Sequence, residues 1–282
     1  MTRTGHVALA GAPNAGKSSL LNALIGSHLA IVSPKPQSTR MPVTGLRSEA
    51  ETQYVFHDLP GLLDPKYLLQ ERMRAAGLGV LERVDVVLHL HPADQGEAPP
   101  FWPLTGLEKP LEVPVLTVYT KSDLHPGEAA GGIRVSATSG VGLDELLDRI
   151  RPLLPEAPFE FDPEDIGTQP LRFFATEYLR EAAFDLLGDE LPYALAVEVE
   201  EFREHTTPIY IRVTLLVERE SQKGIVIGRG GQMLKSLGTY ARGRLEALLG
   251  TPVYLDCWVK VLPGWRRNAV ALDRLGFPES RD

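Results

Sequence analysis

Short apolar runs alternate with segments of helical periodicity over residues 5–153. Runs such as Val84–Leu90 and Val113–Tyr119 consist mostly of apolar residues, which is typical of strands that are buried on both faces. Gly142–Leu153 instead places its apolar residues three and four positions apart, as one face of a helix does. This alternation predicts an α/β domain with a mostly parallel sheet and helices on both faces.

Periodicity is lost between residues 151 and 170, in a stretch that is rich in proline and in acidic side chains. Such a change in composition indicates a domain boundary. We therefore expect a first domain over residues 1–154, a proline-rich linker over 155–170 and a second domain over 171–282.

The second half shows a different order of elements. Leu171–Leu187 has helical periodicity, Tyr193–Phe202 and Pro208–Val217 read as strands, Gln232–Leu249 is a long helix, and Pro252–Val259 is a closing strand. With a further helical turn before residue 228, the predicted order is α-β-β-α-α-β, which indicates an α+β domain.

Composition is that of a globular protein, with 282 residues, 43% hydrophobic residues, 23% charged residues and a net charge of -8. The single cysteine, Cys257, excludes an intramolecular disulfide and fits a reducing cytoplasm. No apolar run approaches 18 residues, and the first strand begins within a few residues of Met1. We therefore expect neither a transmembrane segment nor a signal peptide.

Residues 11–18 read Gly-Ala-Pro-Asn-Ala-Gly-Lys-Ser, which matches the phosphate-binding pattern G-x-x-x-x-G-K-[ST]. The motif follows a short apolar strand and opens a helix, whose positive N-terminus favours bound anions. Backbone N–H groups of such a loop surround phosphate oxygens. Lys17 can reach the phosphates, and the Ser18 hydroxyl can ligate Mg²⁺.

Two further candidates for this site follow the first helix. Thr39 lies in the unpatterned loop 27–42 and could complete a Mg²⁺ shell. Asp58 and Gly61 form a D-x-x-G pattern after a predicted hairpin. The carboxylate can hold Mg²⁺ through water, and the backbone N–H of Gly61 can approach a terminal phosphate closely.

Two other strand ends carry groups that suit a purine base. Thr120–Asp123 follows the strand at 113–119, and the Asp123 carboxylate can accept both the N1–H and the 2-amino hydrogens of guanine. Lys121 can cover the base, and the N–H of Ala137, after Ser136, could reach the guanine O6. Ligands of open α/β sheets bind at the carboxyl ends of the strands. We therefore expect all these motifs to meet at one edge.

The second half contains a G-x-x-G motif at Gly228–Gly231, between two predicted helices. Residues 206–270 hold ten lysines and arginines against four acids, a local net charge of +6 that suits a polyanion. This arrangement resembles a type II KH domain, in which the motif clamps single-stranded nucleic acid. Trp265 and the two arginines after it could extend that surface, or Trp265 could simply be packed in the core.

The order of the first-half motifs resembles the translation-factor-like GTPases, and the loop at Gln37–Arg40 together with the second half is similar to the Era family. The resemblance spans nearly the whole chain. It implies that GTP or GDP is bound by Asn14, Ala15, Gly16, Lys17, Ser18, Ser19, Asp58, Thr120, Lys121, Asp123, Ser136 and Ala137. It implies that Mg²⁺ is held by Ser18, Thr39 and Asp58, and that Lys17, Thr39 and Gly61 act in catalysis. It implies that RNA is bound by Lys223, Ile225, Ile227, Gly228, Arg229, Gly230, Gly231 and Lys235.

Three positions depart from the expected GTPase patterns. Thr120 stands where the base-recognition pattern Asn-Lys-x-Asp has asparagine, and a hydroxyl offers fewer hydrogen bonds than an amide. Leu59 replaces a threonine, a change that we expect to be mild. Leu62 stands where Ras-like enzymes carry the glutamine that orients the attacking water, so we predict slow intrinsic hydrolysis.

The resemblance implies a GTP-driven switch that binds 16S-type small-subunit ribosomal RNA near its 3′ end and acts in assembly of the small (30S) ribosomal subunit. We expect a cytoplasmic monomer, and peripheral contact with the inner face of the membrane is left open. Because Leu62 cannot orient water, a nucleotide-gated RNA-binding scaffold with incidental hydrolysis is the alternative. A P-loop kinase or ATPase is disfavoured by Asp123 and Ala137.

Overall fold

The computed structural model describes residues 1–110, 112–125, 127, 131–188 and 190–279. The chain divides into two compact units. One comprises Met1–Lys66 with Met73–Thr168, and the other comprises Tyr67–Arg72 with Gln169–Arg281. Residues 67–72, which follow the D-x-x-G loop closely in sequence, are therefore part of the second unit.

The first unit contains a six-stranded sheet in the order β2-β3-β1-β4-β5-β6. Its strands are β1 Arg3–Ala10, β2 Val43–Ser48, β3 Thr52–Asp58, β4 Val86–Pro92, β5 Val115–Thr120 and β6 Ile133–Arg134. Neighbouring strands are parallel except for β2 and β3, which form an antiparallel hairpin. The predicted α/β fold with a mostly parallel sheet is confirmed.

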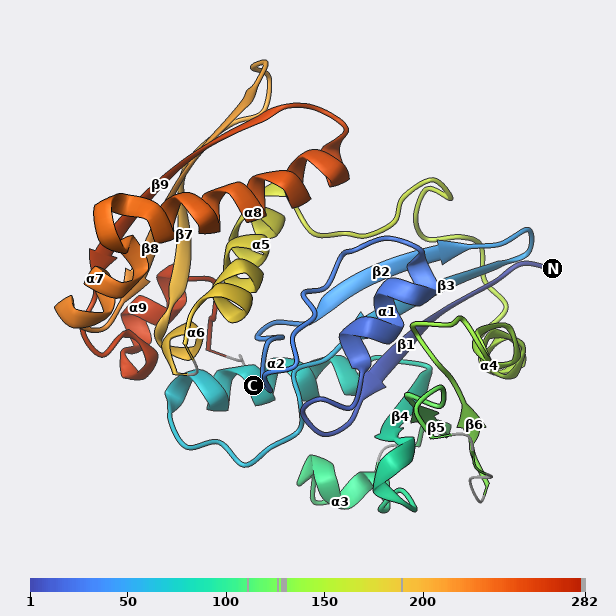
Figure 1. Ribbon diagram of the computed structural model, residues 1–282. Helices are drawn as coiled ribbons and strands as arrows, with labels where there is room; N and C mark the ends of the chain where they lie inside the picture. Colours follow the sequence, from blue (N-terminus) through green and yellow to red (C-terminus); the bar gives the residue numbers. More distant parts are fainter. Residues whose placement is uncertain (111, 126, 128–130, 189, 280–282) are drawn as a thin grey trace. The chain divides into compact units, whose positions relative to one another are not determined.

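Helices cover this sheet on both faces (Figure 1). They are α1 Lys17–Ile25, α2 Leu68–Leu81, α3 Phe101–Thr105 and α4 Leu143–Ile150, with 3₁₀ turns at Ala93–Gln95 and Arg151–Leu153. Every side chain of Val7–Ala10 is fully buried, as expected for a central strand between two helical layers. Ala8 and Ala10 belong to a core cluster with Leu81 and Phe101. This burial fixes the carboxyl end of β1, where the P-loop begins.

The proline-rich segment after residue 154 is an ordered part of the first unit, up to Thr168. The Gln53 side chain accepts the N–H groups of Glu160 and Phe161 at 2.8 and 3.0 Å and donates to the Phe161 carbonyl at 2.9 Å. Gly167 forms a β-bridge with Gly45 at the edge of the sheet. These bonds replace the backbone pairing that a segment without regular structure lacks, so residues 155–168 are not a free connection.

The second unit contains the three-stranded sheet β7-β8-β9, formed by Ala196–Arg203, Ile209–Val217 and Val253–Val261. β7 and β8 are antiparallel, and β8 and β9 are parallel. Its helices are α5 Leu171–Leu186, α6 Leu191–Ala194, α7 Glu220–Ile227, α8 Gln232–Leu249 and α9 Ala269–Arg274, with 3₁₀ turns at Arg229–Gly231 and Trp265–Arg267. α5 and α8 lie side by side against the sheet (Figure 1).

The second unit corrects one prediction from the sequence, the start of a strand, and chooses between the two alternatives for Trp265. Residues 193 and 194 end the short helix α6, which begins with proline in its first turn, instead of starting a strand. Trp265 is fully buried, and its indole N–H donates to the Ala194 carbonyl at 2.9 Å. The structure therefore supports core packing for Trp265.

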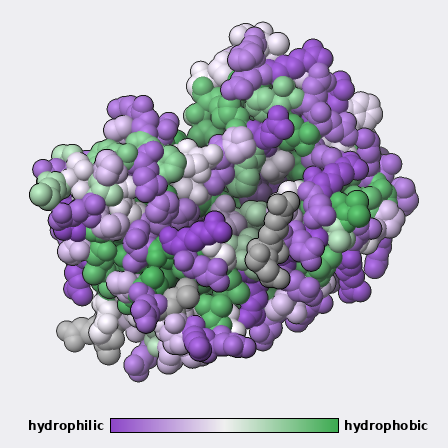
Figure 2. All heavy atoms as spheres, turned by 180° about the vertical axis from the view of Figure 1, so that it is seen from behind, coloured by the Kyte–Doolittle hydropathy of each residue, from purple (hydrophilic) through white to green (hydrophobic). Residues whose placement is uncertain are grey.

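No helix in the described part of the chain is long and apolar enough to cross a membrane. The face drawn in Figure 2 is largely hydrophilic, with apolar groups in small clusters between the polar ones.

Candidate active site and nucleic-acid interface

The phosphate-binding loop lies between β1 and α1 and is curled around the Lys17 side chain. The Lys17 ammonium donates to the carbonyls of Gly11 at 3.2 Å and Ala12 at 2.8 Å. Gly16 has a φ of +85°, a conformation that glycine adopts without strain. Burial lowers the pKa of Lys17 to about 8, and the negative charge of Asp58 partly opposes this shift. The loop thus holds a buried cation at its centre.

Three oxygen-bearing side chains from distant parts of the sequence converge beside this cation. The Ser18 hydroxyl donates to Asp58 Oδ2 at 2.6 Å, and the Thr39 hydroxyl donates to the same oxygen at 3.1 Å. The two hydroxyl oxygens are 2.9 Å apart, and Asp58 is fully buried. Hydroxyl and carboxylate oxygens are the hard donors that Mg²⁺ prefers, so this set fits the predicted metal.

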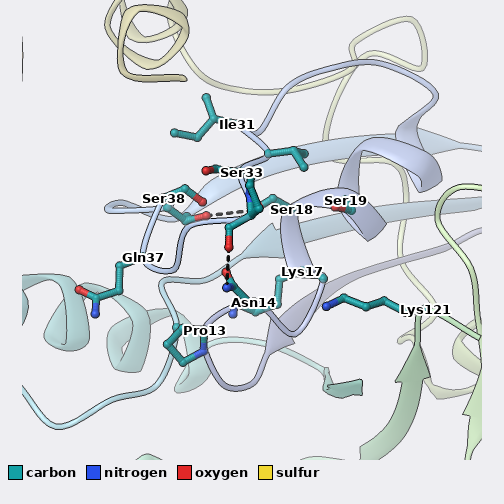
Figure 3. A pocket seen from close by; sticks show the side chains of 15 residues that line it. Pro13, Asn14, Lys17, Ser18, Ser19, Ile31, Ser33, Gln37, Ser38 and Lys121 are labelled. Atoms are coloured by element: carbon teal, nitrogen blue, oxygen red, sulfur yellow. Dashed lines mark hydrogen bonds between the residues drawn. The ribbon is translucent and has the colours of Figure 1, made fainter. Parts of the chain in front are cut away.

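A cavity of about 310 Å³ opens over the loop. Among the predicted residues, its lining includes Asn14, Gly16, Lys17, Ser18, Ser19, Thr39, Gly61 and Lys121. Lys121, from the end of β5, and Gln37, from the loop after α1, lie on opposite sides of the P-loop in Figure 3. Gly61 is tight against Pro13, because a Cβ there would lie 2.9 Å from the Pro13 nitrogen. The cavity therefore brings together residues of four predicted segments: the P-loop, loop 27–42, the D-x-x-G pattern and Thr120–Asp123.

Sequence reasoning missed the residues that form the other wall of this cavity. They are Ile31, Val32, Ser33, Pro34, Gln37 and Ser38. Asn14 Nδ2 donates to the Pro34 carbonyl at 2.9 Å. Asn22 of α1 accepts the N–H groups of Leu29 and Ala30 at 3.0 and 2.9 Å and so fixes the start of the loop. Two signals were available, namely the unpatterned loop 27–42 itself and an asparagine inside a helix, a residue type that often bonds to nearby backbone.

The predicted base-binding residues lie at the ends of β5 and β6. A hollow of about 410 Å³ shares Ser19 and Val32 with the first cavity and is also lined by Ala137. The Ser136 side chain is fully buried and accepts the N–H of Ser139 at 3.1 Å. Asp123 is exposed in the turn after β5 and lines neither hollow. Its predicted bond to guanine stays a prediction.

The interior of the predicted nucleotide site also contains Ala15 and Thr120, both buried. The Thr120 hydroxyl donates to the Ala15 carbonyl at 2.8 Å. Neither side chain lines the cavity. These two residues therefore stabilise the P-loop from the protein interior, on the side away from the cavity.

In the second unit, the G-x-x-G motif forms a compact turn between α7 and α8. Gly228, Gly230 and Gly231 have φ values of +73°, +59° and +80°. Three positive φ values in four residues explain why glycine occupies these positions. Arg229, between them, is exposed.

A hollow of about 380 Å³ runs from this turn between α8 and β9, with Gly231, Lys235 and Arg242 in its lining. Its apolar lining comes from Leu234, Leu255 and Cys257. Burial raises the pKa of the Cys257 thiol to about 12, so that residue contributes apolar surface.

The two isoleucines among the predicted RNA-binding residues, Ile225 and Ile227, do not line this hollow. Ile225 is 56% exposed on α7, which ends at Ile227, whereas the hollow follows α8 and β9. Lys223 is half-buried on the same helix. The apolar lining of this hollow comes from α8 and β9, and RNA contacts of Lys223, Ile225 and Ile227 stay a prediction.

Comparison with known proteins covers both units. Residues 6–121 match the family model of the 50S ribosome-binding GTPases, and residues 190–266 match that of the KH domain. The GTPase Era of Carboxydothermus hydrogenoformans is 37% identical, with 98% of each chain covered. The GTPase Era of Lactobacillus helveticus is 38% identical, with 98% of this chain and 96% of the relative covered.

Two solved structures are similar over almost the entire chain. One is a variant of Aquifex aeolicus Era bound to GDP and AlF₄⁻, with a TM-score of 0.90, 37% identity and coverage of 99% of this chain and 100% of that chain. The other is Era in complex with MgGDPNP and nucleotides 1506–1542 of 16S ribosomal RNA, with a TM-score of 0.91 and the same identity and coverage. With a P-loop unit, a KH unit and this full-length identity, the chain belongs to the Era family of GTPases.

Proposed function

We propose that this protein is a GTP-hydrolysing switch that binds small-subunit ribosomal RNA through its second unit and acts in assembly of the 30S subunit. The observation that carries the proposal is the presence, in one chain, of the P-loop oxygen set and of a G-x-x-G turn beside a basic hollow. A solved relative with the same two units holds MgGDPNP and 16S ribosomal RNA.

In the first unit, Asn14–Ser19 would bind the phosphates, and Ser18 and Thr39 would hold Mg²⁺ with Asp58 behind them. When bound, Mg²⁺ would offset negative charge on the phosphates. The protein would place the Lys17 ammonium beside the phosphates and the backbone N–H of Gly61 against the terminal phosphate. Asp123 would select guanine over adenine.

Intrinsic hydrolysis should be slow, because Leu62 is not available to orient water. It packs against the core cluster that contains Ala8 and Leu59, and its N–H donates to the Gly11 carbonyl at 3.1 Å. A single-turnover rate as high as that of a glutamine-bearing GTPase with its activator would contradict this proposal. The partly buried, apolar side chain of Leu62 also favours the scaffold alternative. A variant that binds GTP without hydrolysing it, yet still supports 30S assembly, would favour that alternative.

The route from nucleotide to RNA would pass through residues 67–72, which follow the Gly61 loop and belong to the second unit. Arg72 is buried there and donates to the Asp273 carboxylate at 2.6 Å and to the Phe277 carbonyl at 2.5 Å. Ordering of loop 59–67 by a terminal phosphate would therefore act on a segment that is built into the second unit.

The test is to measure affinity for a single-stranded fragment of the 3′ end of 16S ribosomal RNA with GDP and with a non-hydrolysable GTP analogue. We expect at least a several-fold difference between the two states. Equal affinities would refute the coupling, and the absence of binding in both states would refute the RNA-binding role. Competition by ATP as strong as that by GTP would instead favour the kinase or ATPase class.

Location and oligomeric state belong to the same proposal. We expect a cytoplasmic monomer, to be tested by sedimentation at several concentrations. Peripheral contact with the inner membrane face would show as co-sedimentation with vesicles of acidic phospholipids.

A further inference from the structure

Thr120, the last residue of β5, ties the base-recognition loop to the P-loop. Its side chain is 4% exposed, and its hydroxyl donates to the Ala15 carbonyl at 2.8 Å. A second carbonyl, that of His91, lies 3.5 Å from the same oxygen. Gly16 lies next to this contact, since a Cβ there would be in van der Waals contact with the Thr120 side chain at 3.4 Å.

This arrangement leaves the Thr120 hydroxyl without a hydrogen for the nucleotide. A hydroxyl carries one hydrogen, and both oxygens in reach are carbonyl oxygens, which accept only. The hydrogen is therefore directed to the P-loop. The guanine N7 is also only an acceptor, so Thr120 has nothing to offer it.

We propose that Thr120 is a positioning residue that holds the P-loop through the Ala15 carbonyl, and that this chain reads guanine without a side-chain contact to N7 from position 120. The inference rests on the proposed guanine site, in which Asp123 accepts the N1–H and 2-amino hydrogens. Selectivity for guanine then depends on the bonds of its N1–H and 2-amino group to Asp123, and Thr120 supports phosphate binding.

The proposal makes 7-deaza-GTP, in which a C–H replaces N7, the informative ligand. The wild-type protein should bind GTP and 7-deaza-GTP with dissociation constants within twofold of each other. Thr120→Asn supplies an amide with two N–H donors, of which one can bond to Ala15 and the other can face the base. This variant should prefer GTP over 7-deaza-GTP by about two- to tenfold, the range of one neutral hydrogen bond.

Two further variants test the positioning role. Thr120→Val keeps the shape but leaves the buried Ala15 carbonyl without its donor, which should weaken GTP and 7-deaza-GTP equally, by about tenfold. Thr120→Ser keeps the hydroxyl and should restore most of the affinity. Thermal unfolding without nucleotide verifies that each variant is folded. A loss of fold would lower the bound fraction, but it would not change the ratio of the two dissociation constants.

Titration calorimetry of the full-length protein with Mg²⁺ and each nucleotide gives these constants. A wild-type preference for GTP over 7-deaza-GTP of tenfold or more would overturn the proposal, as would unchanged affinity in folded Thr120→Val. Inosine triphosphate, which lacks the 2-amino group, tests the Asp123 assignment separately. If it binds as well as GTP, the proposed guanine site fails, whereas the Thr120→Val result still decides the positioning role.

Discussion

At the scale of single residues, Asp58 has the most demanding role in the nucleotide site. One of its oxygens accepts hydrogen bonds from both Ser18 and Thr39 in a fully buried position. Asp58→Asn removes the charge and replaces an acceptor with an amide. We expect the Mg²⁺ concentration for half-maximal GTP binding to rise by about 10- to 100-fold, measured by titrating Mg²⁺ against a fluorescent GTP analogue.

A matched control for this change lies six residues along the chain. Asp64 is fully exposed, and its carboxylate is 3.4 Å from the Arg74 guanidinium. Asp64→Asn should leave the Mg²⁺ dependence as it is, because an exposed pair of this kind is weak. An Asp58→Asn protein that needs no more Mg²⁺ than the wild type would remove Asp58 from the metal site.

His89, in the middle of the sheet, makes stability depend on pH. Burial, and secondly the charge of His91, lowers the pKa of His89 to about 4, below its ordinary value of 6.5. The unfolded chain therefore binds more protons between these values, so stability is complete above pH 6.5 and falls as the pH drops towards 4. We expect a loss of about 1–2 kcal/mol in the free energy of unfolding between pH 7 and pH 5.

Urea unfolding of the wild type and of His89→Gln at both pH values measures this effect. The variant should lose less stability on acidification. Some loss should remain, because burial and the charge of His6 also lower the pKa of His57 to about 4. Identical pH dependence in the two proteins would contradict the role of His89.

The sequence predicted the site residues that belong to a continuous motif or that follow directly after a strand. Lys17, Ser18 and Asp58 follow from local patterns, and the parallel sheet alone brings them together. Loop 27–42 was a candidate from the sequence, but which of its residues form the cavity wall could not be predicted, because the loop has no periodicity and its course depends on Asn22. The exposure of Ile225 on α7 likewise depends on tertiary packing, and its predicted contact with RNA stays a prediction.

At the scale of elements, two glycines in the turn between α7 and α8 differ in how well they should tolerate a side chain. Gly228 has φ +73° and ψ 176°, a region that only glycine readily occupies, and a Cβ there would lie 2.7 Å from Met233 Cβ. Gly230 has no atom within 4 Å of an added Cβ. We expect Gly228→Ala to cost about 2 kcal/mol or more and Gly230→Ala about 1 kcal/mol, measured by urea unfolding. Equal costs would contradict the steric argument.

The same geometry identifies a variant that tests RNA binding without disturbing the fold of the turn. A side chain at position 228 disturbs the turn itself, so loss of RNA binding would be ambiguous. Arg229 is exposed at the tip of the turn, and Arg229→Glu replaces an attractive charge with a repulsive one. We expect RNA affinity to fall by about tenfold or more at low salt, with a smaller loss at high salt. Arg172→Glu, an exposed charge reversal on α5, serves as the control.

Elements were predictable wherever periodicity was strong. Helix α8 has the predicted bounds Gln232–Leu249, because its glycine neighbours mark both ends. The strand that we expect before Ser136 has only two residues in the sheet, Ile133 and Arg134. Beyond them the chain turns, with the Ser136 N–H bonded to the Val141 carbonyl. A short apolar run gives no sign of where pairing stops, because pairing depends on the neighbouring strand.

At the scale of the whole molecule, the sequence indicated two units and, within the second, a basic stretch over residues 206–270. It did not indicate that residues 155–168 are held by the first unit. That order depends on tertiary contacts, namely the Gln53 side chain, which accepts two backbone N–H groups and donates to a carbonyl, and the β-bridges of Glu156 with Arg3 and of Gly167 with Gly45. Nor did periodicity show that the first turn of α2 belongs to the second unit, since one continuous helix runs through the division.

Helix α2 provides a matched pair of arginines to test how nucleotide and RNA are coupled. Arg72 bonds to Asp273 and Phe277 within the second unit, whereas Arg74 donates to the carbonyls of Leu63 and Thr105 within the first. We expect Arg72→Ala to reduce the ratio of RNA affinities between the GTP-analogue and GDP states towards one, because loop 59–67 would no longer bias the second unit. GTP affinity should stay unchanged.

Arg74→Ala should keep that ratio, because its lost bonds lie in the first unit alone. RNA binding by fluorescence anisotropy, in both nucleotide states and for both variants, measures the effect, and thermal unfolding verifies the fold. Removing Arg72 deprives the buried Phe277 carbonyl and the exposed Asp273 carboxylate of a donor, so some loss of stability is expected. Arg72→Lys retains the charge and should show a smaller effect. An unchanged ratio in a folded Arg72→Ala protein would mean that the nucleotide acts on RNA binding through another segment.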